Sequence, residues 1–194
     1  MPPPLVRKIA VLGSRAVGKS SLSVQFVDNT FSDTYYPTIE HTYTKIIKFR
    51  GNEFAIEIVD TAGQDEYSIF NSKHAIGIHG YILVYSLTSR ASFTLIKHIR
   101  DKILNYTGLD WVPLVIVGNK SDLADRERQV EKGEGQKLAE AWKCVYIEAS
   151  AKLNQSVTRV FELLLQEIER TSDGTGGAGG APASRSGGDG CTIF

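Results

Sequence analysis

Residues 13–20 read GSRAVGKS and match the phosphate-loop pattern, in which two glycines separated by four residues precede a lysine and a hydroxyl residue. The apolar residues 9–12 come before this loop and a helical period follows it, so the loop is predicted to join a buried strand to a helix. The N–H groups of such a loop and of the helix N-terminus converge on one point, where they attract an anion. Lys19 would then contact the β- and γ-phosphates of a nucleotide, and the Ser20 hydroxyl would ligate Mg²⁺. A glycine-containing turn that matches the pattern by chance is the alternative.

Residues 60–64 read DTAGQ and directly follow another predicted buried strand. A carboxylate at this place, Asp60, lies across from the phosphate loop and can hold Mg²⁺ through water. Gly63 can present its backbone N–H to the γ-phosphate, and Gln64 can orient an attacking water molecule. Gln64 need not be a strong base, because phosphoryl transfer depends mostly on positioning and charge stabilisation. A polar turn after a strand is the alternative interpretation.

Residues 119–122 read NKSD and end a fifth predicted strand. The Asp122 carboxylate can accept hydrogen bonds from the adjacent N1–H and 2-amino groups of guanine, whereas adenine has no such pair of donors on that edge. The wrong base would leave a buried charge unpaired, so this loop favours guanine. Asn119 can hold neighbouring loops together, Lys120 can lie over the base, and Ala151, in a loop after the sixth strand, can donate its N–H to the guanine carbonyl.

These loops need a scaffold that brings them to one edge. Predicted strands cover residues 6–12, 42–49, 54–59, 80–85, 114–118 and 145–147, and predicted helices cover residues 20–28, 89–104, 131–142 and 156–170. Residues 30–41 are predicted to form a loop, because Pro37 disfavours a helix, and a weak helix is expected after residues 61–66. Strands alternate with helices, and only the second and third strands form an antiparallel hairpin. The predicted fold class is therefore a three-layer α/β phosphate-loop fold, with a six-stranded, mostly parallel sheet and one antiparallel edge strand.

The chain of 194 residues carries 22 basic and 22 acidic residues, so its net charge gives no reason to expect nucleic acid as a partner. Two cysteines, Cys144 and Cys191, form no disulfide framework and fit a reducing, cytosolic compartment. Neither a secretory leader nor an apolar run long enough to cross a bilayer is found, so secretion and membrane insertion are not predicted. The four histidines lack metal-ligand spacing and are interpreted as surface or packing residues.

The composition changes at Thr171. Residues 171–194 are mainly glycine, serine and alanine, which cannot form a core, so a globular domain is predicted over residues 1–170 and a disordered tail after it. The last four residues, CTIF, fit a prenylation signal in which Cys191 receives the lipid, and Phe194 favours geranylgeranyl by the general rule. One lipid without a basic patch binds membranes weakly and reversibly, which favours endomembranes over the plasma membrane.

The motifs GxxxxGKS, DTAGQ, NKxD and SAK, present in this order, resemble those of small GTPases of the Ras superfamily over about residues 5–170. Within the superfamily the chain is most similar to the Rheb branch, on account of Arg15, residues 35–40 and residues 64–70. The Rheb branch is usually farnesylated, which leaves farnesyl and geranylgeranyl as alternatives. The resemblance implies a monomer that binds GTP or GDP with Mg²⁺, activates the TOR kinase complex in its GTP form, and is inactivated by a tuberin-type activating protein that supplies an asparagine. It also implies the cytoplasmic face of endomembranes (lysosome or vacuole, Golgi or ER), with part of the protein in the cytosol.

The resemblance also implies individual site residues. Phe31 would contact the edge of guanine, Ser32 would lie near the ribose, and Tyr35 would cover the phosphates. Thr38 and Gly63 would sense the γ-phosphate and order the segments that contain them. The predicted nucleotide site comprises Gly13, Ala16, Val17, Gly18, Lys19, Ser20, Ser21, Phe31, Ser32, Tyr35, Thr38, Gly63, Asn119, Lys120, Asp122, Ser150 and Ala151; the metal ligands are Ser20, Thr38 and, through water, Asp60; and the catalytic residues are Gln64, Lys19 and Thr38, modulated by Arg15.

Arg15 departs from the glycine that most relatives carry at this position. A long side chain there would crowd the γ-phosphate and impair Gln64, which predicts slow intrinsic hydrolysis and a chain that rests largely GTP-bound until an activating protein acts. Alternatively, Arg15 turns outward to solvent and changes little. Tyr36 replaces an acidic residue usual in the Rheb branch and Ala16 replaces a serine, so effector contacts and loop polarity are not predicted in detail.

Three functions follow as hypotheses. The leading one is a membrane-tethered switch that hydrolyses GTP. The second is an effector-binding domain with negligible hydrolysis in cells, for which Arg15 is the motivating residue. The third is a phosphate-loop kinase that uses ATP, which is disfavoured by Asp122 and by the lack of a lid or an acceptor site in the sequence.

Overall fold

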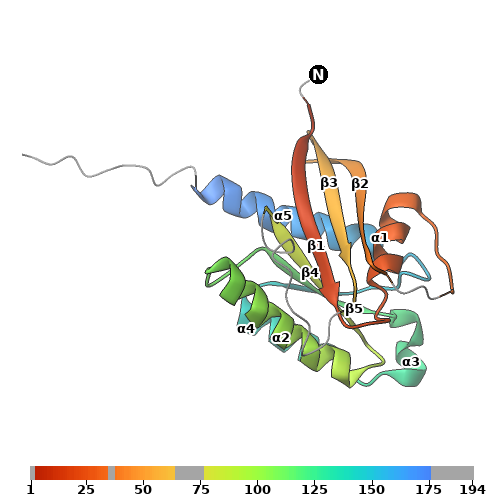
Figure 1. Ribbon diagram of the computed structural model, residues 1–194. Coiled ribbons are helices and arrows are strands. Elements are labelled where there is room, and N and C mark those ends of the chain that lie inside the picture. The colour runs from red at the N-terminus through yellow and green to blue at the C-terminus, as the bar shows by residue number, and fades with distance from the viewer. Residues whose placement is uncertain (1–2, 35–37, 64–76, 176–194) are drawn as a thin grey trace, which may run out of the picture.

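The computed structural model describes residues 3–34, 38–63 and 77–175, with side chains described as far as residue 172. In chain order the elements are β1 (Leu5–Gly13), α1 (Lys19–Asp28), β2 (Glu40–Phe49), β3 (Asn52–Thr61), β4 (Gly80–Ser86), α2 (Arg90–Thr107), β5 (Leu114–Asn119), η2 (Ser121–Leu123), α3 (Ala124–Glu127), α4 (Lys132–Trp142), β6 (Val145–Glu148) and α5 (Val157–Thr175). A central sheet is covered by helices on both faces, with α1 and α5 on one face and α2 and α4 on the other (Figure 1).

The six strands pair in the order β2-β3-β1-β4-β5-β6. β2 and β3 are antiparallel along their whole length, whereas all the other pairs are parallel. Arg50 and Gly51 turn the chain between β2 and β3 with φ angles of 49° and 84°, the backbone that a two-residue hairpin needs. The predicted fold class is confirmed, including the antiparallel edge strand.

Side chains of β1 alternate between two cores, because successive residues of a strand point to opposite faces of the sheet. Ile9 and Val11 pack in the core beneath α1 and α5, while Ala10 and Leu12 pack in the core beneath α2 and α4. β4 and β5 are buried along their entire length, as expected for central strands with helices on both faces. The loops that follow β1, β3, β5 and β6 therefore meet at one edge of the sheet.

The structure corrects the predicted end of the last helix. That end was placed near Arg170, but α5 continues to Thr175. The Thr171 and Ser172 hydroxyls donate to the Ile168 carbonyl at 2.7 and 3.1 Å, a local bond that these residues form inside helices. The change in composition therefore does not mark the end of the helix, and the first five residues of the predicted tail are helical.

Other differences are smaller. η2 and α3 are not predicted, because three and four residues are too few to show a helical period. β2 begins at Glu40, which shortens the predicted loop before it. Ser89, the first residue of the helix predicted over residues 89–104, is the N-cap of α2, and its Oγ accepts the Ser92 N–H at 3.3 Å. The weak helix expected after residues 61–66 falls on residues that the structure does not describe, as does the tail after residue 175. No described helix combines the length and the apolar character needed to cross a bilayer.

Candidate functional site

The phosphate loop lies between the end of β1 and the first residue of α1, where the sequence places it. Gly18 caps α1 with φ 95° and ψ 28°, a left-handed conformation that costs glycine no steric strain. A Cβ atom at Gly18 would also collide with the side-chain nitrogen of Asn119, so a larger residue is excluded for two reasons. No described side chain caps α1, which leaves the N–H groups of its first turn for a ligand.

The Lys19 side chain points back into the phosphate loop, toward Ser14. It is 5% exposed, and Nζ donates a hydrogen bond to the Ser14 carbonyl at 2.8 Å. Burial lowers the pKa of Lys19 to about 8, while the charge of Asp60 acts in the opposite direction. A buried ammonium group needs compensating negative charge, and phosphate oxygens at this loop would supply it.

Three oxygen-bearing side chains meet at the predicted metal position. Ser20 Oγ and Thr38 Oγ1 are 2.7 Å apart, close to the ~2.9 Å edge of an octahedron with Mg–O bonds of ~2.05 Å. Asp60 is fully buried, and within the described residues neither of its carboxylate oxygens accepts a hydrogen bond. Burial raises the pKa of Asp60, and the nearby Ser20 hydroxyl and Lys19 charge oppose this effect. A hard divalent cation fits this set, because it takes hydroxyl oxygens and water as ligands and would compensate the buried carboxylate.

Asn119 connects three loops at this edge of the sheet. It is 1% exposed; its Nδ2 donates to the Val17 carbonyl at 2.8 Å, and its Oδ1 accepts the Ala151 N–H at 3.3 Å. Asp122, which lies in η2, accepts a hydrogen bond from the buried Ser150 hydroxyl at 2.6 Å. The phosphate loop, the loop after β5 and the loop after β6 are thereby held together, and the Asp122 carboxylate is oriented by its neighbour.

The other predicted contacts surround these loops. Phe31 is partly buried against the core beneath α1 and α5, and Lys120 is partly buried with a left-handed φ of 65°. Ser32 is exposed, and its Oγ accepts the backbone N–H two residues later at 3.2 Å. The Ala151 N–H donates to Asn119, so a donation from Ala151 to guanine requires this N–H to change partner or to serve two acceptors.

Arg15 lies at the tip of the phosphate loop, with its side chain exposed. Gly63 packs directly on it: a Cβ atom at Gly63 would lie 2.5 Å from Arg15 Cα and 2.7 Å from Arg15 N, and would collide with Arg15 Cγ. Glycine is thus required at this contact between the phosphate loop and the segment after β3. Tyr35, Gln64 and Cys191 lie outside the described residues, so the predicted influence of Arg15 on Gln64 stays a prediction.

The sequence model of the Ras family matches residues 8–170. The chain belongs to the Ras family. It is 58% identical over 193 residues to "GTP-binding protein rhb1" of Schizosaccharomyces pombe, a match that covers 100% of both chains. It is 59% identical over 178 residues to "Small monomeric GTPase RhbA" of Aspergillus fumigatus (92% of this chain, 95% of that protein), and 50% identical over 184 residues to human "GTP-binding protein Rheb" (95% and 99%). Within the Ras family the chain lies in the Rheb branch, as its motifs indicate.

One partly buried network of this Ras-family domain is not predicted from the sequence. Arg128 donates two hydrogen bonds of 2.9 Å to the Glu148 carboxylate, which also accepts the Tyr146 hydroxyl at 2.8 Å. Tyr85 extends the network, with its hydroxyl 3.1 Å from that of Tyr146. Glu148 is the last residue of β6 and stands two positions before Ser150, so the network fixes where the final loop of the site begins. The only sequence signal is the position of Glu148 beside the SAK motif, and no pattern points to Arg128.

We expect Arg128→Met to lower the free energy of unfolding by about 2 kcal/mol, because the Glu148 carboxylate would stay partly buried without its cation. Adding Glu148→Gln is expected to restore about half of this loss, since the unpaired charge is then gone. Burial raises the pKa of Glu148, but the bonds from Arg128 and Tyr146 outweigh burial, so the net pKa is lowered. The pair therefore stabilises the fold above the unfolded pKa of about 4.3, and this contribution is lost as the pH falls through the lower folded value.

Urea unfolding of the parent and both variants at pH 7 and pH 3 measures these effects. The loss caused by Arg128→Met should be smaller at pH 3 than at pH 7. An equal loss at the two pH values would show that Arg128 contributes by packing rather than through its charge.

Proposed function

We propose that this chain is a membrane-tethered switch that binds GTP or GDP with Mg²⁺ and hydrolyses GTP slowly. This proposal rests on three groups at one edge of the sheet: the oriented Asp122 carboxylate, the buried Lys19 ammonium, and the buried Asp60 carboxylate, which accepts no hydrogen bond from the described residues. Two of the relatives are named GTP-binding proteins and the third a small monomeric GTPase, which supports the same proposal.

Guanine would be recognised by the Asp122 carboxylate, which Ser150 orients and which can accept both the N1–H and the 2-amino group. Asn119 would keep this loop beside the phosphate loop, so that base and phosphates are bound by one rigid unit. Lys19 would exchange the Ser14 carbonyl for phosphate oxygens, which would raise its pKa from about 8 toward the ordinary value.

Ser20 and Thr38 would hold Mg²⁺ directly and Asp60 would hold it through water; the ion would supply charge neutralisation at the β- and γ-phosphates. Thr38 precedes β2 and Gly63 follows β3, so contacts of both residues with the γ-phosphate would couple two segments to the nucleotide. Gln64 would orient the attacking water, and Lys19 would stabilise the charge that develops on the transferred group.

The proposal extends to partners by resemblance to the Rheb branch. The GTP form would activate the TOR kinase complex, and a tuberin-type protein would accelerate hydrolysis by supplying an asparagine. A prenyl group on Cys191 would attach the monomeric chain weakly and reversibly to the cytoplasmic face of endomembranes, such as the lysosome or vacuole, the Golgi or the ER.

Single-turnover hydrolysis of GTP tests the proposed activity and the role of Arg15. We expect slow hydrolysis by the parent and about tenfold faster hydrolysis by Arg15→Gly, because Arg15 packs against Gly63, the residue before Gln64, and small displacements of a positioning group cost rate. Arg15→Lys keeps a long side chain and should stay slow.

ATP should neither displace GTP nor be hydrolysed in the same assay. Equal rates for the parent and Arg15→Gly would refute crowding by Arg15. Displacement of GTP by ATP would favour the kinase hypothesis, and failure of an activating protein to stimulate hydrolysis would favour an effector-binding domain without enzymatic turnover.

A further inference from the structure

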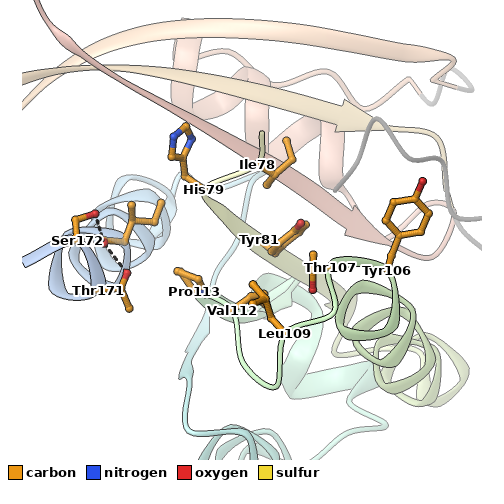
Figure 2. Close-up of a pocket in the computed structure, with 11 residues that line it drawn as sticks. Ile78, His79, Tyr81, Tyr106, Thr107, Leu109, Val112, Pro113, Thr171 and Ser172 are labelled. Atoms are coloured by element: carbon orange, nitrogen blue, oxygen red, sulfur yellow. Dashed lines mark hydrogen bonds between the residues drawn. The ribbon is translucent and has the colours of Figure 1, made fainter. Parts of the chain in front are cut away.

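A cavity of about 500 Å³ opens at the edge of the sheet opposite the nucleotide loops (Figure 2). Its apolar wall comes from the start of β4, the loop between α2 and β5, and the last turns of α5. The apolar residues of this wall are Ile78, Tyr81, Leu109, Val112, Pro113 and Ile168. Because β4 and β5 run parallel from this cavity toward the phosphate and base loops, a ligand here would not overlap with a bound nucleotide. The volume falls within the ~300–1,000 Å³ of pockets that hold small organic ligands.

The wall of the cavity carries no full charge. None of its eleven lining residues is lysine, arginine, aspartate or glutamate. His79 uses its Nδ1 to accept the Lys8 N–H at 2.9 Å, and the Thr107 and Ser172 hydroxyls donate to carbonyls of their own helices. The wall therefore presents mainly carbon atoms, and it fits an uncharged apolar guest better than a phosphate, a nucleotide or a peptide rich in charge.

Tyr81 is the polar group that the fold leaves unpaired in this wall. It lies in the middle of the lining residues (Figure 2), it is 1% exposed, and its hydroxyl has no hydrogen-bond partner among the described residues. The hydroxyl oxygen is itself closed off from the cavity space, so a guest would contact the Tyr81 ring rather than its oxygen.

We propose that the cavity holds the prenyl group on Cys191 and the backbone next to it, folded back from the tail of the same chain; this inference rests on the proposed lipidation of Cys191. α5 contributes Ile168, Thr171 and Ser172 to the cavity wall and ends at Thr175, so the tail starts beside the cavity. Residues 176–190 contain no large apolar side chain. The apolar end of the tail is the segment CTIF, residues 191–194.

The length of the tail permits this return. Fifteen residues, 176–190, lie between Thr175 and Cys191, and a Gly/Ser-rich linker of the corresponding 16 Cα–Cα steps has a mean end-to-end distance of roughly 20–24 Å. Such a linker presents its end at an effective concentration on the order of 1 mM. If the cavity binds the free lipid with a dissociation constant of ~0.1 mM, chains with a docked lipid would outnumber chains with an undocked lipid about ten to one. Docking would therefore compete with the weak membrane binding of a single lipid.

The test uses the full chain with a farnesyl group attached chemically at Cys191. The Cys144 thiol reacts little, because burial raises its pKa to about 12, and a Cys191→Ser chain carried through the same reaction controls for it. Methyl resonances of Ile78, Val112 and Ile168 should shift on lipidation, while that of the exposed Ile46 on β2 should not. No shift of the cavity methyls would overturn the proposal.

A second measurement follows the partition of the lipidated chain into phosphatidylcholine vesicles. Leu109→Trp fills the mouth of the cavity from a position that is 55% exposed, and it should raise vesicle binding about tenfold and abolish the methyl shifts. Ile46→Trp, at a position that is 61% exposed on β2, is the matched control and should behave as the parent. Tyr81→Phe keeps the cavity and the aromatic ring in its wall, and should behave as the parent. Equal partition of Leu109→Trp and Ile46→Trp would also overturn the proposal.

These results can be separated from the proposed function. Guanine-nucleotide binding is measured on the same samples, and it should be unchanged by Leu109→Trp. The mass of the chain isolated from cells reports whether Cys191 is lipidated. An unmodified Cys191 in that sample would overturn the proposed anchoring, whereas loss of docking with normal nucleotide binding and a lipidated Cys191 would overturn only the cavity proposal.

Discussion

Asp122→Asn is expected to lower the affinity for GTP and GDP by about 10³-fold and to raise the affinity for xanthosine nucleotides. In the parent, one Asp122 oxygen accepts the Ser150 hydroxyl at 2.6 Å, so the carboxylate is held in one orientation. Its negative charge would pair with two N–H donors of guanine, and loss of such a desolvated, charge-assisted pair costs on the order of 4 kcal/mol. An asparagine offers one acceptor and one donor, which match the N1–H and the 2-carbonyl of xanthine.

Competition with a fluorescent guanine nucleotide measures both changes. Asp125→Asn is the matched control, because Asp125 is an exposed carboxylate three residues further along the chain and should leave both affinities unchanged. If Asp122→Asn bound GTP as the parent does, Asp122 would not read the base, and the preference for guanine over adenine would lose its physical basis.

The parts of this site that the sequence predicts are those in which the chemistry lies on contiguous residues. The phosphate loop needs Gly18 for its left-handed backbone and Lys19 and Ser20 for its ligands, and all three are adjacent in the chain. The mostly parallel α/β sheet follows from the alternation of apolar strands and amphipathic helices, because only a few topologies satisfy that alternation. These features are encoded by neighbouring residues and can be predicted from the sequence alone.

Features that depend on distant pairs could not be predicted. Arg128 and Glu148 are 20 residues apart, and nothing in either local sequence specifies the other as its partner. The cavity around Tyr81 is built from three separate stretches of chain, residues 78–81, 106–113 and 168–172, so its volume exists only in three dimensions. The end of α5 was misplaced because Thr171 can satisfy a helix carbonyl with its own hydroxyl, which composition does not reveal.

Asp60→Asn is expected to have opposite effects on the empty and the loaded protein. Without metal, the Asp60 carboxylate is fully buried and accepts no hydrogen bond from the described residues, so removing its charge should raise the free energy of unfolding by about 1 kcal/mol. With Mg²⁺ and nucleotide, the same charge would act on the ion, and its loss should weaken Mg²⁺ binding about 100-fold, or about 2.7 kcal/mol.

Urea unfolding in a chelating buffer measures the first effect, and titration of the GDP-bound chain with Mg²⁺ measures the second. Asp110→Asn changes an exposed carboxylate and should alter neither quantity. The distinguishing result is a higher free energy of unfolding together with a lower affinity for Mg²⁺. Replacing a residue that only stabilises the fold would lower both the free energy of unfolding and the affinity for Mg²⁺. A less stable metal-free chain with unchanged Mg²⁺ affinity would mean that the buried charge is compensated by protein atoms, and that the cation is held by Ser20 and Thr38 without Asp60.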